Sequence, residues 1–157
     1  MSLDLKIYRL GVESPGYTAI DVTEYVRRVV SESGMLNGLV LVYSKEDGCA
    51  VIEIEYEPGL LADLEELLKR IGCLDTKLCD AVLGKEVQVL VVNGELFLGQ
   101  FKRIVLVDIS RVAGEKELDE ALRAQRFLSQ QLLNSPSRAT TSSFSPATLD
   151  ISTSTIL

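Results

Sequence analysis

The chain of 157 residues contains no histidine and no tryptophan. Histidine is the usual general base near neutral pH and the commonest side-chain ligand of metals, so its absence excludes a Ser-His-Asp triad and a Cys-His pair. Only three cysteines are present, Cys49, Cys73 and Cys79. We expect three reduced thiols, and because no histidine completes a set of zinc ligands, the sequence predicts neither a metal nor a cofactor.

Positive charge is also scarce. Lysine and arginine number 16 against 23 aspartate and glutamate residues, which gives a formal net charge of −7 and an isoelectric point near 4.7. A nucleic-acid partner needs a basic surface, so none is expected. Apolar runs long enough to span a bilayer are missing, and the first residues lack the features of a signal peptide. We therefore expect a cytoplasmic protein without membrane contact.

Hydrophobic residues make up 46% of the chain, enough for a folded core. The clearest pattern lies at residues 84–109. A valine-rich segment precedes Asn93-Gly94 and an alternating segment follows it, which is a strong signal for a tight hairpin. The following segment, 104–109, is apolar almost throughout, which predicts a strand covered on both faces.

In the earlier half of the chain, apolar residues recur at every second position in some segments, as in strands, and at a helical spacing in others. Asp21 and Glu24 form a capping-box pattern, Gly34 is a helix stop, and Pro58 is a helix start. The expected strands are 3–10, 17–20, 38–43 and 49–56, and the expected helices are 22–33 and 58–71. This order predicts an α+β domain over residues 1–113.

Two further segments are predicted after this domain. Residues 114–133 are rich in Glu, Ala, Leu, Arg and Gln, which predicts an amphipathic C-terminal helix. Residues 134–157 form a Ser/Thr-rich tail, which we expect to dock on a neighbouring subunit.

Several short motifs recur in an order that resembles the YjbQ family, some of whose members are credited with a secondary thiamine-phosphate synthase activity. The resemblance implies a two-layered β-sandwich with two main helices, assembled as a homotrimer. The motifs that carry it are Asp21-Val22-Thr23, Asn37-Gly38-Leu39-Val40, Ala50, Glu55, Pro58-Gly59, Asp63, Leu83-Gly84, Gly94 and Leu98-Gly99.

The chain departs from the family at its polar positions. Glu46-Asp47-Gly48 stands where the family has His-Thr-Thr, Lys77 replaces a second histidine, and Phe101-Lys102 replaces Trp-Gln. The scaffold is kept while the histidines are gone, so we expect the ancestral catalytic site to be lost or altered.

The candidate site residues follow from this resemblance. Glu55 and Asp63 match family positions and are the candidate catalytic carboxylates, and Lys77 and Lys102 are candidate contacts for a small anionic ligand. The alternative for all four is an ordinary solvated surface residue. The missing histidines favour a protein that is not an enzyme but leave the question open.

Three functions are therefore compatible with the sequence. The first is a trimeric YjbQ-like protein of unknown function with a lost or altered catalytic site. The second is an enzyme on a small phosphorylated substrate, similar to thiamine-phosphate synthase, using Glu55 with Lys77 or Lys102. The third is an assembly module that binds a partner chain through the C-terminal helix and tail.

Overall fold

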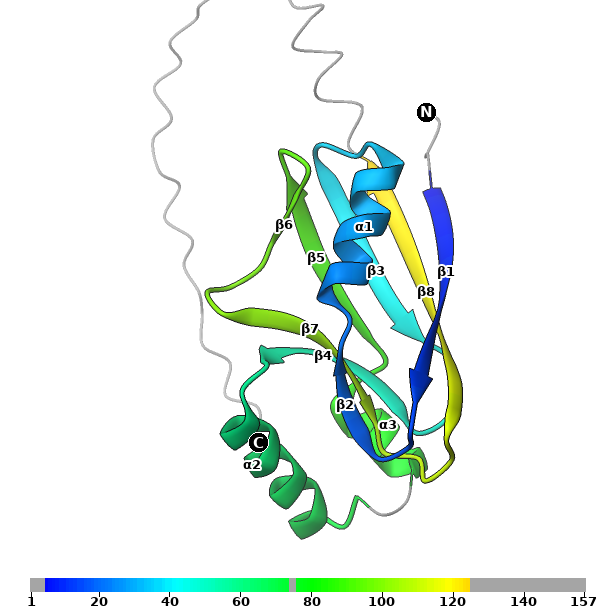
Figure 1. Ribbon diagram of the computed structural model, residues 1–157, viewed down its shortest axis with the longest axis vertical. Helices are drawn as coiled ribbons and strands as arrows, with labels where there is room; N and C mark the ends of the chain where they lie inside the picture. Colours follow the sequence, from blue (N-terminus) through cyan, green and yellow to red (C-terminus); the bar gives the residue numbers. More distant parts are fainter. Residues whose placement is uncertain (1–4, 74–75, 125–157) are drawn as a thin grey trace, which may run out of the picture. The chain divides into compact units, whose positions relative to one another are not determined.

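A computed structural model describes residues 5–73 and 76–124 (Figure 1). The domain is α+β, as predicted. Its elements are β1 (Leu5–Ser14), β2 (Thr18–Asp21), α1 (Thr23–Ser33), β3 (Gly38–Ser44), β4 (Cys49–Glu55), α2 (Pro58–Arg70), α3 (Thr76–Leu83), β5 (Glu86–Val92), β6 (Glu95–Phe97), β7 (Lys102–Asp108) and β8 (Gly114–Ala124). No helix among these is long and apolar enough to cross a bilayer.

The strands form two antiparallel sheets. The larger sheet has five strands in the order β1-β8-β3-β5-β6, and the smaller has three in the order β2-β7-β4. The predicted meander is confirmed but is shared between the sheets, because β5 and β6 belong to the larger one and β7 is the centre of the smaller one. Asn93 and Gly94 turn the β5–β6 hairpin with φ angles of 52° and 81°, the left-handed values that a type I′ turn requires.

The main core lies between the two sheets and beneath α1. Figure 1 shows α1 crossing in front of β3, β5 and β8, with the three-stranded sheet below it. Val22, Val26 and Val30 pack from the α1 side, and Ile104 and Leu106 pack from β7. The spacing of the valines is the helical period that predicted α1, whose C-terminus at Gly34 has the expected left-handed conformation.

One detail of the α1 start differs from the prediction. The N-cap is Val22, with no side-chain cap, rather than Asp21. Asp21 instead accepts a hydrogen bond from the Thr23 backbone N–H at 2.9 Å and forms an ion pair with Arg103 at 2.7 Å. Burial tends to raise the pKa of Asp21, but the bonds from Thr23 and Arg103 outweigh it and the pKa is lowered.

Both faces of β7 are covered, as its apolar sequence predicts. Residues 104–108 are all buried. Ile104 and Leu106 face the main core, while Val105 and Val107 join a second core beneath α2 and α3 that includes Leu68. The three-stranded sheet is therefore a middle layer, between the larger sheet with α1 on one side and α2 with α3 on the other.

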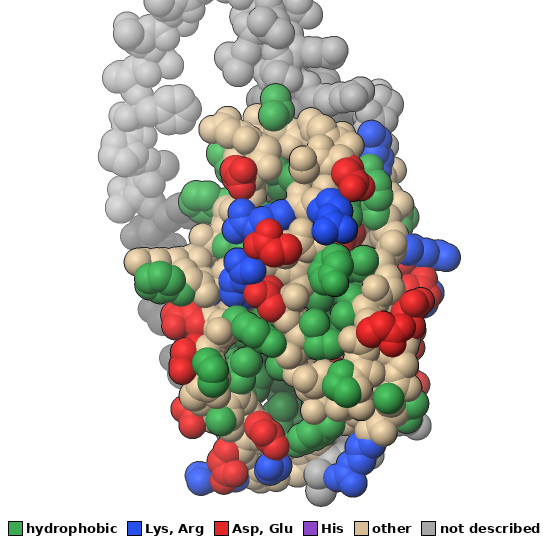
Figure 2. Space-filling model, in the orientation of Figure 1, with side chains coloured by type: hydrophobic (Ala, Val, Ile, Leu, Met, Phe, Trp, Pro, Cys, Tyr) green, Lys and Arg blue, Asp and Glu red, His purple; other side chains and the backbone are tan. Residues whose placement is uncertain are grey.

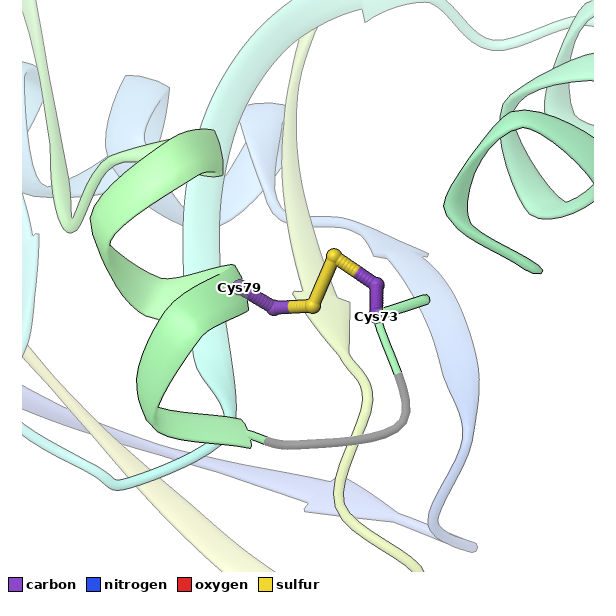
Figure 3. Close-up of a disulfide and its surroundings, with 2 residues drawn as sticks. All are labelled: Cys73 and Cys79. Carbon is purple, nitrogen blue, oxygen red and sulfur yellow. A yellow bond between two sulfur atoms is a disulfide. The ribbon is translucent and has the colours of Figure 1, made fainter. Parts of the chain in front are cut away.

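The cysteines differ from the prediction of three reduced thiols. Cys73 and Cys79 form a disulfide that links the end of the α2 segment to α3 (Figure 3). Their Cα atoms lie 5.3 Å apart because α3 folds back over the second core, a tertiary contact that the spacing of the cysteines could not reveal. Cys49 is a free thiol and is fully buried.

The predicted C-terminal helix is wrong for the part that the structure describes. Gly114–Ala124 is strand β8, which pairs with β1 on one side and β3 on the other. The two strong sheet partners override the helix propensity of its glutamate, alanine and leucine residues. The domain therefore extends to Ala124 rather than ending at residue 113, and the remainder of the predicted helix and tail lies outside the described residues.

Alternation along β8 separates its two faces. Lys116, Leu118, Glu120 and Leu122 are buried, whereas Glu115 and Arg123 are exposed. The Glu120 side chain is fully buried and neither carboxylate oxygen has a hydrogen-bond partner among the described residues. Burial raises the Glu120 pKa to about 7, because a neutral carboxyl is less costly than a charged one in an apolar surrounding.

The opposite face of the five-stranded sheet is not covered by any helix or strand of residues 5–73 and 76–124. Strand pairing aligns Leu5, Arg123, Leu39, Leu90 and Phe97 in one row across all five strands. The exposed apolar side chains on this face are Leu5 at 58%, Ile7 at 62%, Leu90 at 52%, Val92 at 42% and Phe97 at 69%. We call these five residues the outer apolar face.

Candidate functional site

Glu55 and Lys102 are brought together by the register of the three-stranded sheet. They are directly opposite each other at the end of the β4–β7 pair. The Lys102 Nζ lies 3.9 Å from the Glu55 Oε1, and the two side chains are 39% and 45% exposed. An ion pair this exposed to water has little capacity to transfer a proton or to bind an anion tightly.

The loop before β7 packs against the same pair. Gly99 donates its backbone N–H to Glu53 at 3.5 Å, and Lys102 donates its own to the Gly99 carbonyl at 3.0 Å. A Cβ on Gly99 would lie 2.9 Å from the Lys102 Cγ, so glycine here makes room for the lysine stem. Phe101 stands at the loop tip with a φ of 61° and is 74% exposed.

The other two predicted site residues do not join this pair. Asp63 is exposed on α2 and makes no hydrogen bond or ion pair within the described part of the chain. Lys77 lies in α3, but its side chain is outside what the structure describes. The structure therefore connects two of the four predicted residues, Glu55 and Lys102.

The segment that replaces the family's His-Thr-Thr is fixed by contacts that sequence analysis missed. Lys85 donates to the backbone carbonyls of Glu46 and, at 2.6 Å, Cys49, and it lies 3.4 Å from Asp80. Asp80 accepts a hydrogen bond from the Gly48 backbone N–H at 3.1 Å. These groups bind the protein's own backbone, so they stabilise the start of β4 and leave few groups free for a ligand.

A second polar cluster is buried at the junction of β1, β7 and β8. The Asp108 carboxylate accepts hydrogen bonds from Ser14 at 2.6 Å and from the Ser110 hydroxyl at 2.6 Å. Lys116 donates to the Ser110 hydroxyl at 3.2 Å and lies 3.9 Å from Asp108. The cluster connects strands of both sheets, and no single stretch of sequence indicates it because its members are up to 102 residues apart along the chain.

Cys49 lies beside this cluster and is unsuited to act as a nucleophile. Burial, followed by the nearby negative charge of Asp108, raises the pKa of the Cys49 thiol to about 12. The thiolate that nucleophilic chemistry needs is therefore negligible near neutral pH.

Ion pairs gather on the face that carries α1, where Figure 2 shows acidic and basic side chains intermixed. Arg103 lies 3.1 Å from Glu24, and Arg27 lies 3.5 Å from Glu24 and 3.2 Å from Glu95. Arg103 and Arg27 are thus each balanced by nearby carboxylates. This network stabilises the contact of α1 with β6 and β7, and neither of its two arginines is left uncompensated for a ligand.

Together, these features define a class of α+β proteins with a five-stranded and a three-stranded antiparallel sheet. A profile of the family "UPF0047 protein YjbQ-like" matches residues 9–118. The chain belongs to this family. The match ends within β8, which supports placing the start of that strand in the family domain.

Relatives of known sequence agree with this membership. A UPF0047 protein of Archaeoglobus fulgidus is 30% identical over 66% of this chain and 90% of its own length. A UPF0047 protein of Methanothermobacter thermautotrophicus is 29% identical over 57% of this chain and 72% of its own length.

Solved structures share the fold. A YbjQ-like protein of unknown function from Sulfolobus solfataricus superposes with a TM-score of 0.70 at 22% identity, covering 77% of this chain and 99% of that one. A YjbQ/UPF0047 protein from Clostridium acetobutylicum gives a TM-score of 0.66 at 19% identity, covering 74% and 98%. The family is one of uncharacterised proteins, and these likenesses show a fold rather than an activity.

Proposed function

We propose that this protein is a homotrimer-forming member of the YjbQ-like family that has lost the family's catalytic site. The observation that carries the proposal is the outer apolar face, whose exposed apolar side chains lie on β1, β5 and β6 of the five-stranded sheet. Exposed apolar patches of this kind mark protein interaction sites, because a monomer gains nothing by leaving them in water. A sheet face is well suited to pack against another subunit, and in a ring of three copies the contact is head-to-tail, so this face would meet a different surface of the next copy.

The polar residues support the loss of catalysis. Glu55 and Lys102 form a pair that is open to solvent, and the segment around Gly48 is held by Lys85 and Asp80. The described residues offer neither a histidine nor a thiol of low pKa to replace the missing base. The number three comes from the resemblance to the family, and the acidic net charge favours a protein partner over nucleic acid.

The outer apolar face can be tested with a matched pair of lysine substitutions. Leu90 on β5 is 52% exposed and belongs to this face, whereas Leu67 on α2 is 53% exposed and lies elsewhere. Leu90→Lys and Leu67→Lys thus add the same charge at equal exposure. We expect light scattering to give about three times 17.2 kDa for the wild type and Leu67→Lys, and a lower mass for Leu90→Lys.

Two results would overturn this assignment of the interface. The first is a Leu90→Lys protein that remains a trimer at low micromolar concentration and is as stable as the wild type. The second is a Leu67→Lys protein that dissociates while Leu90→Lys does not, which would transfer the interface to α2.

The proximity of Glu55 and Lys102 favours a second candidate function, an enzyme on a small phosphorylated substrate. The lysine would contact the phosphate and the carboxylate would take a proton, with Lys77 and Asp63 as the further predicted contacts. Calorimetric titration with inorganic pyrophosphate tests this function. Saturable binding that Lys102→Met abolishes would favour the enzyme, whereas absence of binding at millimolar pyrophosphate would reject it.

Two further expectations remain proposals. We place the protein in the cytoplasm, although the Cys73–Cys79 disulfide is unusual in that compartment. Thiol labelling of protein taken directly from cells distinguishes a reduced from an oxidised pair. We also propose that residues 134–157 dock on a neighbouring subunit, which a truncation addresses below.

A further inference from the structure

A pocket of about 360 Å³ opens where α2 lies over the edge of the three-stranded sheet. Its floor is formed by Val107 of β7 and by Ile109 just after that strand, and its walls are β2 and α2. Figure 2 shows hydrophobic side chains gathered around a hollow in the lower part of the face. The size falls in the range of pockets that hold small molecules.

Small side chains on facing elements create this space. Ala19 on β2 and Ala62 on α2 both line the pocket, and Pro58 at the first turn of α2 lines it as well. Leu64 and Leu68 of α2 fill the neighbouring part of the same layer, where they pack into the second core. Both leucines also line the pocket, and the space beside them stays open where α2 has the short side chain of Ala62.

The rim is held in place by contacts of β2. The Tyr17 backbone N–H donates to the Ser110 carbonyl at 2.7 Å, which fixes Tyr17 in a left-handed conformation with a φ of 48°. The Tyr56 hydroxyl donates to the Ala19 carbonyl at 2.9 Å. The first bond joins the residue before β2 to the segment after β7, and the second joins β2 to the segment before α2, so the rim of the pocket is fixed on both sides.

The charges around the pocket exclude one class of ligand. None of the described residues that line it is basic, and the two acidic ones are Glu65 and Asp108. Asp108 is already engaged by Ser14, Ser110 and Lys116, and Glu65 lies 2.7 Å from Lys69. An anion entering the pocket would meet carboxylates without a compensating lysine or arginine among the lining residues.

We propose that this pocket binds a small apolar molecule, aromatic or branched aliphatic, that carries no negative charge. The apolar lining supplies the affinity by burial of the ligand surface, and the Tyr17 ring at the rim adds an aromatic contact. The site lies apart from Glu55, Lys102 and the outer apolar face. The proposed ligand site is therefore independent of the proposed trimer and of the candidate function on a phosphorylated substrate. If one of these proposals fails, the others still stand.

Benzyl alcohol and benzoate test the proposal because they share a ring and differ in charge. The full-length protein is titrated with each, and methyl resonances of Ala19 and Val107 are followed by NMR. We expect saturable shifts of these methyl groups with benzyl alcohol, and binding at least about fivefold weaker with benzoate. Methyl groups of the outer apolar face, such as those of Leu90, serve as the internal reference and should not shift.

Two alanine-to-leucine variants complete the test. Ala62→Leu adds bulk at the pocket wall, and Ala81→Leu makes the same change at an exposed position of α3 outside it. We expect Ala62→Leu to weaken benzyl alcohol binding at least about fivefold while Ala81→Leu leaves it unchanged. Absence of saturable shifts in the wild type, equal binding of benzoate, or an unaffected Ala62→Leu would each overturn the proposal.

Discussion

Strands β7 and β8 show two ways of building a strand with a partner on each side. β7 pairs with β2 and β4 and is apolar over most of its length, so its sequence alone predicted that both faces are covered. β8 pairs with β1 and β3 but alternates charged and apolar residues. Its sequence resembles an amphipathic helix. Position in a sheet is therefore visible in the sequence only when the buried residues are hydrophobic.

The buried charges of β8 account for the difference. Lys116 is compensated by Asp108 and Ser110, whereas Glu120 has no partner among the described residues. A buried ionisable group requires either a partner or a shifted pKa, and β8 contains one example of each. The following predictions test this contrast, beginning with the largest expected effect.

Removing β8 should unfold the domain. A chain ending at Ser110 loses the strand between β1 and β3, which leaves β1 without a sheet partner and the core without Leu118 and Leu122. We expect no cooperative unfolding transition by circular dichroism. The chain ending at Arg126 keeps β8 and should retain the transition of the full-length protein. A folded chain ending at Ser110 would mean that β8 is an accessory strand.

Lys116→Met should cost about 3 kcal/mol of unfolding free energy, because it leaves the Asp108 carboxylate buried without its cation. Methionine keeps most of the length of the lysine side chain, so packing changes little. Urea unfolding at one fixed protein concentration measures the effect, since the proposed assembly would make stability depend on concentration. A loss below about 1 kcal/mol would show that the two serine hydroxyls alone stabilise Asp108.

Glu120 should make the protein less stable as pH rises. The unfolded glutamate ionises near pH 4.5 and the folded one near pH 7, so the folded state binds the extra proton between these values. Stability therefore falls by about 1.4 kcal/mol per pH unit across this window, or roughly 3 kcal/mol in total, and changes no further above pH 7. Glu120→Gln should abolish this part of the slope.

Glu115→Gln provides the control for that experiment, because Glu115 lies on the exposed face of the same strand. The unfolding free energy is plotted against pH for the wild type and each variant. The difference between the two slopes gives the contribution of the substituted carboxyl alone. Equal slopes for wild type and Glu120→Gln would mean that Glu120 is ionised in the folded protein and has found a partner.

Lys102→Met should have the smallest effect, no more than about 1 kcal/mol. Lys102 is the β7 counterpart of Lys116, but its pair with Glu55 is nearly half exposed and separated by 3.9 Å. Solvent screens such a pair, and fixing two long side chains offsets much of the attraction. A loss as large as that of Lys116→Met would remove the distinction between the two lysines.

The fold was predictable where one local signal dominates. Asn93-Gly94, Gly34 and Pro58 each have a backbone preference that fixes a turn or a helix end, and α1 and α2 show clear apolar stripes. The prediction failed at β8 because helix propensity is a property of the segment, whereas β1 and β3 are more than 70 residues away along the chain.

The candidate site was predictable only in part, for a related reason. The family pattern indicated Glu55 and Lys102, and sheet register brings them together. It could not indicate that Lys85 and Asp80 bind the Gly48 segment or that Asp108 and Lys116 form a buried pair, since these contacts exist only after the sheets pack. The Cys73–Cys79 disulfide was missed because its formation depends on where α3 lies.

The central claim is that the described domain carries its own assembly surface, the outer apolar face. Light scattering on the full-length protein and on the chain ending at Arg126 tests it most directly. We predict about three times the monomer mass for both, with residues 134–157 adding to an interface that already exists. A truncated chain that is folded and monomeric while the full-length protein is a trimer would contradict the claim and make those residues the determinant of assembly.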